Sequence, residues 1–138
     1  MNSLESLVKK YKNVCFESSC YNTPEFLKLA ASLKRALKKD IQKSNFILLN
    51  ASAGHFYISG FITHKNGIYI YFSIGDVRWD ITGKRWYDDI LYRTAKDEKD
   101  YHGGANHYCK LGELFEKADM LAEQEKVYFK RMAIASNG

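Results

Sequence analysis

A helical period organises the apolar residues in the first third of the chain. Between residues 23 and 43, apolar side chains recur every three or four positions, which predicts an amphipathic helix with one buried stripe. Thr23 is a suitable N-cap, Pro24 suits the first helical position and Glu25 favours the positive end of the helix dipole. A shorter amphipathic helix is expected before it, over about residues 3 to 12. The expected buried stripe of the longer helix is Phe26, Leu29, Ala30, Leu33, Leu37 and Ile41.

The period changes to two in the centre of the chain, where three stretches are rich in β-branched and aromatic residues and predict strands. The second and third strands flank a Lys-Asn-Gly turn. A three-residue loop that pairs His64 with Ile68 places the aliphatic side chains of both strands on one face, whereas a two-residue turn divides them between two faces. We therefore expect the three-residue register, with Gly67 at positive φ. The three stretches are FILLNAS, HFYISGFITH and IYIYFSIGD.

This register gives the hairpin a second face of different character. The opposite face is rich in aromatic and hydroxyl side chains, so it is half polar by composition. Such a face is either partly covered by another segment or serves as a platform on which bases or a partner's side chains stack. Its expected members are Tyr57, Ser59, Phe61, Thr63, Tyr69, Tyr71 and Ser73.

Two further elements complete the expected fold. The segment DDILYRTA predicts a fourth strand, with Ile90 and Tyr92 on one side and Leu91 and Arg93 on the other. Residues 111–133 return to helical spacing and predict a last helix, so the preceding residues form a strand-to-helix connection. The element order predicts a single α+β domain over residues 1–138. It comprises a basic N-terminal helical region, an antiparallel sheet of about four strands and a C-terminal helix packed on one sheet face.

Composition and charge narrow the class of protein. Of the 138 residues, 46% are apolar and 27% are charged, which are globular values, and no apolar run is long enough for a signal peptide or a membrane span. We therefore expect a cytoplasmic protein without a membrane partner. The formal net charge is +5, and residues 1–43 hold nine Lys and Arg against four Asp and Glu, so the whole excess lies there. Such asymmetry is typical of a surface that attracts polyanions, although many charged helix faces are only solvated.

Several basic and aromatic residues are candidates for binding a partner. Cations follow one side of the first long helix, and two Arg-Trp pairs occupy the loop after the third strand, where rigid aromatic area and a planar charge favour recognition. The segment 101–109 adds tyrosine, histidine and asparagine beside a Gly-Gly pair. The candidate nucleic-acid or partner-binding residues are Lys28, Lys34, Arg35, Lys38, Lys39, Lys43, Arg78, Trp79, Arg85, Trp86, Arg93, Tyr101, His102, Asn106 and His107.

No complete catalytic or metal-binding set can be assembled from the sequence. His102, His107 and Cys109 are residue types that bind zinc, yet their spacing is uncommon and no second cysteine pair completes a tetrahedral site. A nucleophilic Cys109 would need a base close to its thiol. We expect no catalytic residue, no metal and no cofactor, and the three cysteines are expected to be free thiols. The alternative is a small hydrolase or nuclease that uses the loop 101–109.

Four short motifs between residues 59 and 106 carry a resemblance. Ser-Gly-Phe precedes the hairpin, and Arg-Thr-Ala-Lys, Lys-Asp-Tyr and Gly-Gly-x-Asn follow in order. This pattern, which covers about half of the chain, resembles small uncharacterised proteins encoded on bacterial phages, plasmids and integrative elements. The resemblance implies a setting in which small binding proteins inhibit host defence or regulatory complexes, as anti-CRISPR proteins do. It implies no catalytic residue.

The sequence therefore favours a binding protein over an enzyme. Its basic and aromatic features are several and are spread over the chain, whereas the catalytic candidates are incomplete. We expect a mobile-element protein that engages nucleic acid or a host nucleoprotein or defence complex, as an inhibitor.

Overall fold

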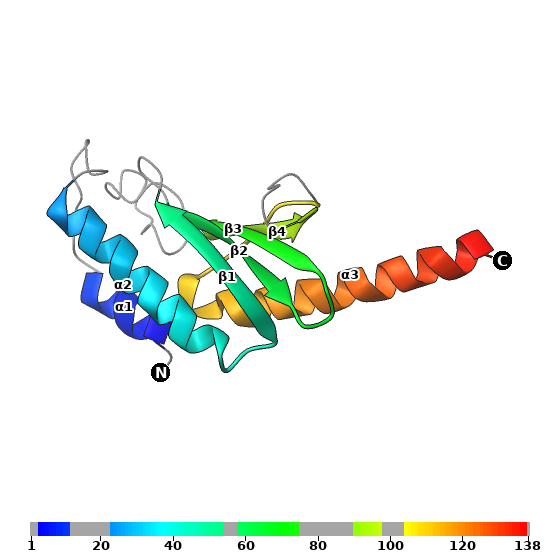
Figure 1. Ribbon diagram of the computed structural model, residues 1–138, viewed down its shortest axis with the longest axis horizontal. Coiled ribbons are helices and arrows are strands. Elements are labelled where there is room, and N and C mark those ends of the chain that lie inside the picture. Colours follow the sequence, from blue (N-terminus) through cyan, green and yellow to red (C-terminus); the bar gives the residue numbers. More distant parts are fainter. Residues whose placement is uncertain (1–2, 12–22, 54–57, 75–89, 98–103, 138) are drawn as a thin grey trace.

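The computed structural model describes residues 3–11, 23–53, 58–74, 90–97 and 104–137, which form three α-helices and one sheet (Figure 1). Helix α1 spans Ser3–Tyr11 and α2 spans Pro24–Ile41. A 3-10 turn, η3, covers Leu111–Glu113 and leads into α3, Leu114–Asn137. None of the described helices has the length and apolar character needed to cross a membrane.

The N-terminus of α2 forms as its residue types predict. Thr23 has an extended backbone, and its side-chain oxygen accepts a hydrogen bond from the N–H of Phe26 at 3.3 Å. Pro24 occupies the first helical position, where a missing N–H has no cost. The apolar stripe is buried as expected, with Ala30 and Ile41 only half-buried at its margins.

The sheet is an antiparallel meander with strand order β1-β2-β3-β4-β5. Within the described residues each strand pairs only with its sequence neighbours, so β1 and β5 are the edges of the described sheet. The strands are β1 (Phe46–Ala53), β2 (Ile58–His64), β3 (Tyr69–Ile74), β4 (Ile90–Ala95) and β5 (His107–Cys109).

The hairpin between β2 and β3 has the three-residue register. The N–H of His64 donates to the carbonyl of Ile68 at 2.8 Å, and Ile62 pairs with Ile70. Gly67 has a φ of 95°, a backbone conformation that glycine adopts at little cost. The aliphatic side chains therefore share one face, and the sequence prediction is confirmed. Ile58, Ile62, Ile70, Phe72 and Ile74 are all buried.

The helices pack on this aliphatic face. Helix α2 lies beside β1, and α3 runs behind β3 and β4 with its C-terminal end extending past the sheet (Figure 1). Buried residues of α1, α2, α3, η3 and the sheet form one hydrophobic cluster. This arrangement leaves the aromatic and hydroxyl face of the sheet on the side away from the core, where Phe61 and Tyr71 are half-exposed.

A buried carboxylate connects α1 to α2. Asp40, in the last turn of α2, is 6% exposed, and its two oxygens accept hydrogen bonds from the backbone N–H groups of Ser3 and Leu4. The first N–H groups of a helix have no partner within the helix, and the helix dipole favours an anion there. Asp40 of α2 therefore caps the N-terminus of α1.

The predicted α+β class is confirmed, with a C-terminal helix on the aliphatic sheet face. In the described part of the chain the sheet has one strand more than the pattern predicted, because His107–Cys109 forms β5 within the segment that we expected to be a connection. Three residues are too few to show a period, so this strand has no signal in the sequence. The assignment of residues 1–138 to a single domain stays a prediction.

Candidate functional site

The predicted cations of α2 are all exposed, as is Lys43, which lies just after the helix. The helical positions fall within an arc of about 140° at 100° per residue, directly opposite the buried stripe. Lys28 and Lys39 are separated by about 16 Å along the helix axis. We call this set the basic row: Lys28, Lys34, Arg35, Lys38, Lys39 and Lys43.

The basic row is not neutralised by acids of the described part of the chain. No described carboxylate forms an ion pair with any of its members, and the guanidinium of Arg35 donates to the hydroxyl of Ser32 at 3.1 Å. Glu25 lies one turn before the row, and Asp40 is buried under α1. The row therefore presents to the solvent a positive surface that no carboxylate of the described residues compensates.

Arg93 lies on the outer sheet face and is separate from the basic row. Its guanidinium carbon sits 5.1 Å from the centre of the Tyr71 ring, and its Nη1 donates to Asn106 Oδ1 at 3.1 Å. Tyr71 in turn packs against Phe61 with ring centres 5.3 Å apart. The structure thus brings together two predicted binding residues, Arg93 and Asn106, on an aromatic surface that suits stacking.

His107 and Cys109 lie on the opposite side of the sheet from Arg93. The ring of His107 stacks on Tyr92 with centres 5.4 Å apart, and Cys109 pairs with the buried Ile90. Burial raises the pKa of the Cys109 thiol to about 12, with a further increase from the charge of Glu113 and a small opposing effect of Lys117. Since only a thiolate is a good nucleophile, Cys109 is a packing residue at neutral pH.

The other predicted site residues lie outside the described residues. They include both Arg-Trp pairs and the first part of the loop 101–109. Their positions relative to the basic row and to Arg93 are therefore left as predictions. These residues are Arg78, Trp79, Arg85, Trp86, Tyr101 and His102.

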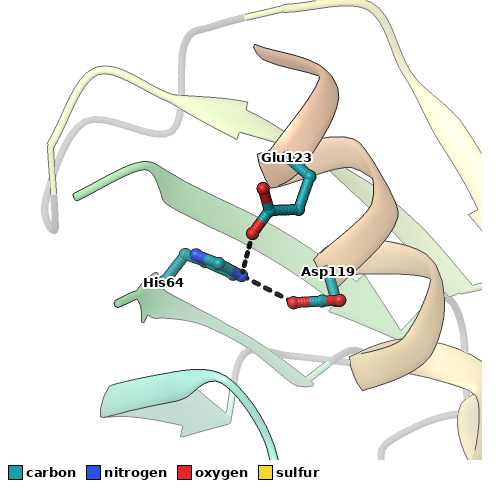
Figure 2. A group of neighbouring side chains, drawn as sticks. All are labelled: His64, Asp119 and Glu123. Atoms are coloured by element: carbon teal, nitrogen blue, oxygen red, sulfur yellow. Dashed lines mark hydrogen bonds and ion pairs between the residues drawn. The ribbon is translucent and has the colours of Figure 1, made fainter. Parts of the chain in front are cut away.

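A cluster that the sequence did not reveal joins the hairpin to α3 (Figure 2). His64, at the end of β2, is 3% exposed, and its Nε2 lies 2.6 Å from Asp119 Oδ1 and 3.6 Å from Glu123 Oε1. Asn45 also donates to Asp119 Oδ1, at 2.9 Å. The ring of Phe46 meets the His64 ring edge-on at 5.1 Å, which closes one side of the cluster.

The hydrogen bonds of His64 fix its tautomer. Its Nδ1 accepts the backbone N–H of Asn66 at 3.1 Å, so Nδ1 carries no proton when the ring is neutral. The proton is then on Nε2 and points at the Asp119 carboxylate. Both ring nitrogens are occupied, and neither is available to remove a proton from a substrate.

The same geometry argues against a metal ion at these three side chains. Their ligand atoms lie within 4.8 Å of one another, which is close enough to surround an ion. A metal-binding histidine, however, donates its second nitrogen's N–H to a carbonyl or carboxylate. Here the second nitrogen faces the N–H of Asn66, which forces Nε2 to hold a proton rather than a metal.

Hydrogen bonds and charge in the cluster connect the β2–β3 hairpin to α3. Burial raises the pKa of Asp119, but hydrogen bonds from Asn45 and His64 outweigh it and hold the pKa below its ordinary value. Two further contacts join the same elements, because Asn66 Nδ2 donates to the carbonyl of Ala122 and Lys126 Nζ donates to that of Asn66. The cluster thus fixes the hairpin turn on α3.

No family model, curated protein or solved structure matches the chain. Function therefore has to be inferred from the chemistry of the described residues. Of these groups, the His64 cluster and Cys109 are structural. The basic row and the aromatic surface around Arg93 remain as candidates for binding a partner.

Proposed function

We propose that the protein is a binding protein that engages nucleic acid or a nucleoprotein complex through the basic row. One observation carries the proposal: the exposed cations of α2 form a continuous row opposite its buried face, and no described acid pairs with them. A helix with this charge pattern matches a phosphate backbone, because Lys and Arg side chains are long enough to reach several phosphates at once.

The setting is part of the same proposal. The motifs around Ser-Gly-Phe and Arg-Thr-Ala-Lys resemble proteins of bacterial mobile elements. A host nucleoprotein or defence complex is the partner that such a protein would block, as anti-CRISPR proteins do. The basic row would then compete with the complex's own binding surface for nucleic acid, or would bind the nucleic acid that the complex already carries.

The salt dependence of binding tests this proposal. Fluorescein-labelled single-stranded DNA, duplex DNA and RNA of twenty nucleotides each are titrated with the protein at several salt concentrations. The logarithm of the association constant should fall with the logarithm of salt, by about 0.7 to 0.9 per phosphate contact. Replacing Lys34, Lys38 and Lys39 with Gln should reduce that slope by about 2 to 3, because up to three contacts are lost.

A charge-matched variant separates the basic row from net charge. Lys65, Lys96 and Lys110 are exposed and lie outside α2, so replacing these three with Gln removes the same charge from other surfaces. This control should change the slope by less than about 1. Equal slopes for the two variants, or a wild type without salt-dependent binding to any of the three probes, would contradict the proposal.

No observation on the described residues favours the hydrolase or nuclease alternative. The thiol of Cys109 is protonated at neutral pH, and His107 is stacked on Tyr92. His64 has both nitrogens engaged.

A further inference from the structure

The hydrogen-bond pattern of the β2–β3 hairpin determines which residues of β2 direct their backbone N–H and C=O groups toward β1. His64 donates its N–H across the hairpin to Ile68. Backbone groups of successive strand residues point to opposite sides, so His64, Ile62 and every second residue before them bond to β3. The residues of β2 that bond to β1 are therefore Ser59, Phe61 and Thr63.

The same alternation in β1 shows which of its residues direct their backbone N–H and C=O groups away from the sheet. Leu48, Asn50 and Ser52 are the register partners of Thr63, Phe61 and Ser59, so their N–H and C=O groups point inward to β2. The groups of Leu49 and Ala51 point away from β2. Among the described residues, no strand or backbone hydrogen bond occupies this outer edge.

The sequence of β1 has few of the usual protections against a further strand. Edge strands are commonly blunted by charged side chains, by proline, by short length, by a bulge or by a covering helix or loop, and here α2 packs beside β1. The sequence of β1, FILLNASA, has eight residues with no charge and no proline. Its one irregularity lies between Phe46 and Leu48, at the start of the strand, so residues 49–53 remain regular.

A cavity of about 330 Å³ lies beside this regular part of the edge, between α2 and β1. Ala30, Ala31 and Lys34 line it from the helix, and Ala51 and Ser52 line it from the strand. Leu33, Leu37 and Ile58 add apolar side chains to its wall, and Lys34 is exposed. A strand added to β1 would direct every second side chain toward this cavity.

We propose that an extended acidic peptide of a partner protein adds to the outer edge of β1 as a sixth strand, with one apolar side chain in the cavity and a carboxylate at Lys34. The backbone groups of Leu49 and Ala51 would provide the hydrogen bonds, the cavity would select the apolar residue and Lys34 would select the charge. This site shares Lys34 with the basic row, but its backbone hydrogen bonds and its cavity belong to β1 and play no part in the proposed nucleic-acid binding.

Charge argues for an acidic peptide over a second copy of the chain. Pairing of β1 with β1 across a two-fold axis would bring two basic rows toward each other, and each chain has a net charge of +5. Like charges placed close together oppose such pairing. An acidic peptide instead meets Lys34, with Lys38 one turn further along the helix.

The test uses a fluorescein-labelled octapeptide, acetylated and amidated, that alternates threonine with apolar residues and carries one glutamate on its apolar side. Two N-methylated forms of this peptide block the N–H groups of alternate residues. Strand addition uses only one edge of the peptide, so one form should lose binding while the other keeps it. On binding, hydrogen exchange should slow at the N–H groups of Leu49 and Ala51.

A charge exchange tests the position of the peptide. Lys34→Glu should weaken binding of the glutamate peptide by about tenfold and should strengthen binding of the same peptide with lysine in place of glutamate. Lys96→Glu is the matched control, because Lys96 is exposed after β4 and belongs neither to the cavity wall nor to the basic row; it should change neither affinity appreciably.

Three results would overturn the proposal. One is that the peptide fails to bind at millimolar concentration, and another is that both N-methylated forms bind as well as the parent. The third is a concentration-dependent dimer in sedimentation that Ala51→Pro abolishes, because it would assign the edge to a second copy of the chain. Ala51→Pro removes an N–H that β2 does not use, and its circular dichroism spectrum shows whether the fold is retained.

Discussion

The carboxylate of Asp40 lies at the N-terminus of α1, where Oδ2 accepts a hydrogen bond of 3.0 Å from the backbone N–H of Leu4. These two residues lie 36 positions apart in the sequence. Leu4 is fully buried, so the hydrogen bond also positions a core side chain. One carboxylate thus caps a helix and orients its apolar face toward the core.

Replacing Asp40 with Ala should lower the free energy of unfolding by about 2 kcal/mol, because the buried N–H of Leu4 and the half-buried N–H of Ser3 lose their acceptor. Asp40→Asn keeps one acceptor oxygen and should cost about half as much. Urea denaturation measures both values. Glu116→Ala, at an exposed position of α3, is the control and should change stability by less than about 0.5 kcal/mol. An equal effect of Asp40→Ala and Glu116→Ala would show that the cap contributes nothing.

The tautomer of His64 should be visible directly. Because Nδ1 accepts the N–H of Asn66, long-range nitrogen NMR spectra at neutral pH should show a protonated Nε2 and an unprotonated Nδ1. One equivalent of zinc should leave both this spectrum and the melting temperature unchanged. A proton on Nδ1, or a zinc-dependent rise in melting temperature that His64→Gln removes, would instead establish a metal site.

The depressed pKa of Asp119 predicts a pH dependence with a definite sign. Its folded-state pKa is below the unfolded value of about 3.9, so its stabilisation is complete above that value and is lost as pH falls through the folded pKa. Urea midpoints measured stepwise from pH 6 to pH 2 should therefore fall more steeply for the wild type than for Asp119→Asn. Glu116→Gln on the same helix should follow the wild type, and parallel curves for all three proteins would refute the assignment.

Gly67 should be sensitive to substitution for a purely conformational reason. Its φ is 95°, and a Cβ placed there meets no atom within 4 Å, so no clash contributes. Gly67→Ala should lower the free energy of unfolding by about 1 kcal/mol, because a side chain disfavours this backbone region. Gly67→Asn should cost less, since asparagine enters the left-handed region more readily. If Ala and Asn have the same small effect, the turn adapts to the substitution.

The raised pKa of Cys109 predicts that its thiol reacts slowly with thiol-specific reagents. With a pKa of about 12, its thiolate fraction at pH 8 is lower by a factor of roughly a thousand than that of an ordinary cysteine, and its rate with a disulfide reagent should fall accordingly. The measurement uses Cys15→Ser/Cys20→Ser protein, so that only Cys109 can react. Reaction at the full rate after unfolding in urea is the positive control. Rapid modification of the folded protein would restore Cys109 as a candidate nucleophile.

The hairpin register and the orientation of α2 were predictable because each depends on local periodicity. Ile62 and Ile70 belong to one face in only one register, and the helix spacing from Phe26 to Leu37 defines one buried side. The prediction of exposed cations at Lys34 and Lys39 follows from the same spacing.

The His64 cluster was not predictable for the opposite reason. His64 and Asp119 are 55 residues apart, and neither belongs to a recognisable motif. In the sequence of the hairpin, His64 simply ends the apolar face of its strand. In the sequence of α3, Asp119 follows the buried Ala118 and resembles any acidic residue on a helix surface. Only the packing of α3 against the turn brings them together, and that packing depends on the whole core.

The meander order of the sheet makes its strand pairs local in sequence, so these pairs can form faster during folding than contacts between distant segments. Each strand pairs with its sequence neighbour, and the β2–β3 loop has three residues, so the central hairpin can close early with a small entropy cost. Helix α1 instead contacts η3 near the other end of the sequence, where the Glu5 side chain lies against Gly112. That contact closes a much longer loop than the hairpin does. We therefore expect α1 to dock last during folding and to detach first, ahead of any opening of the sheet.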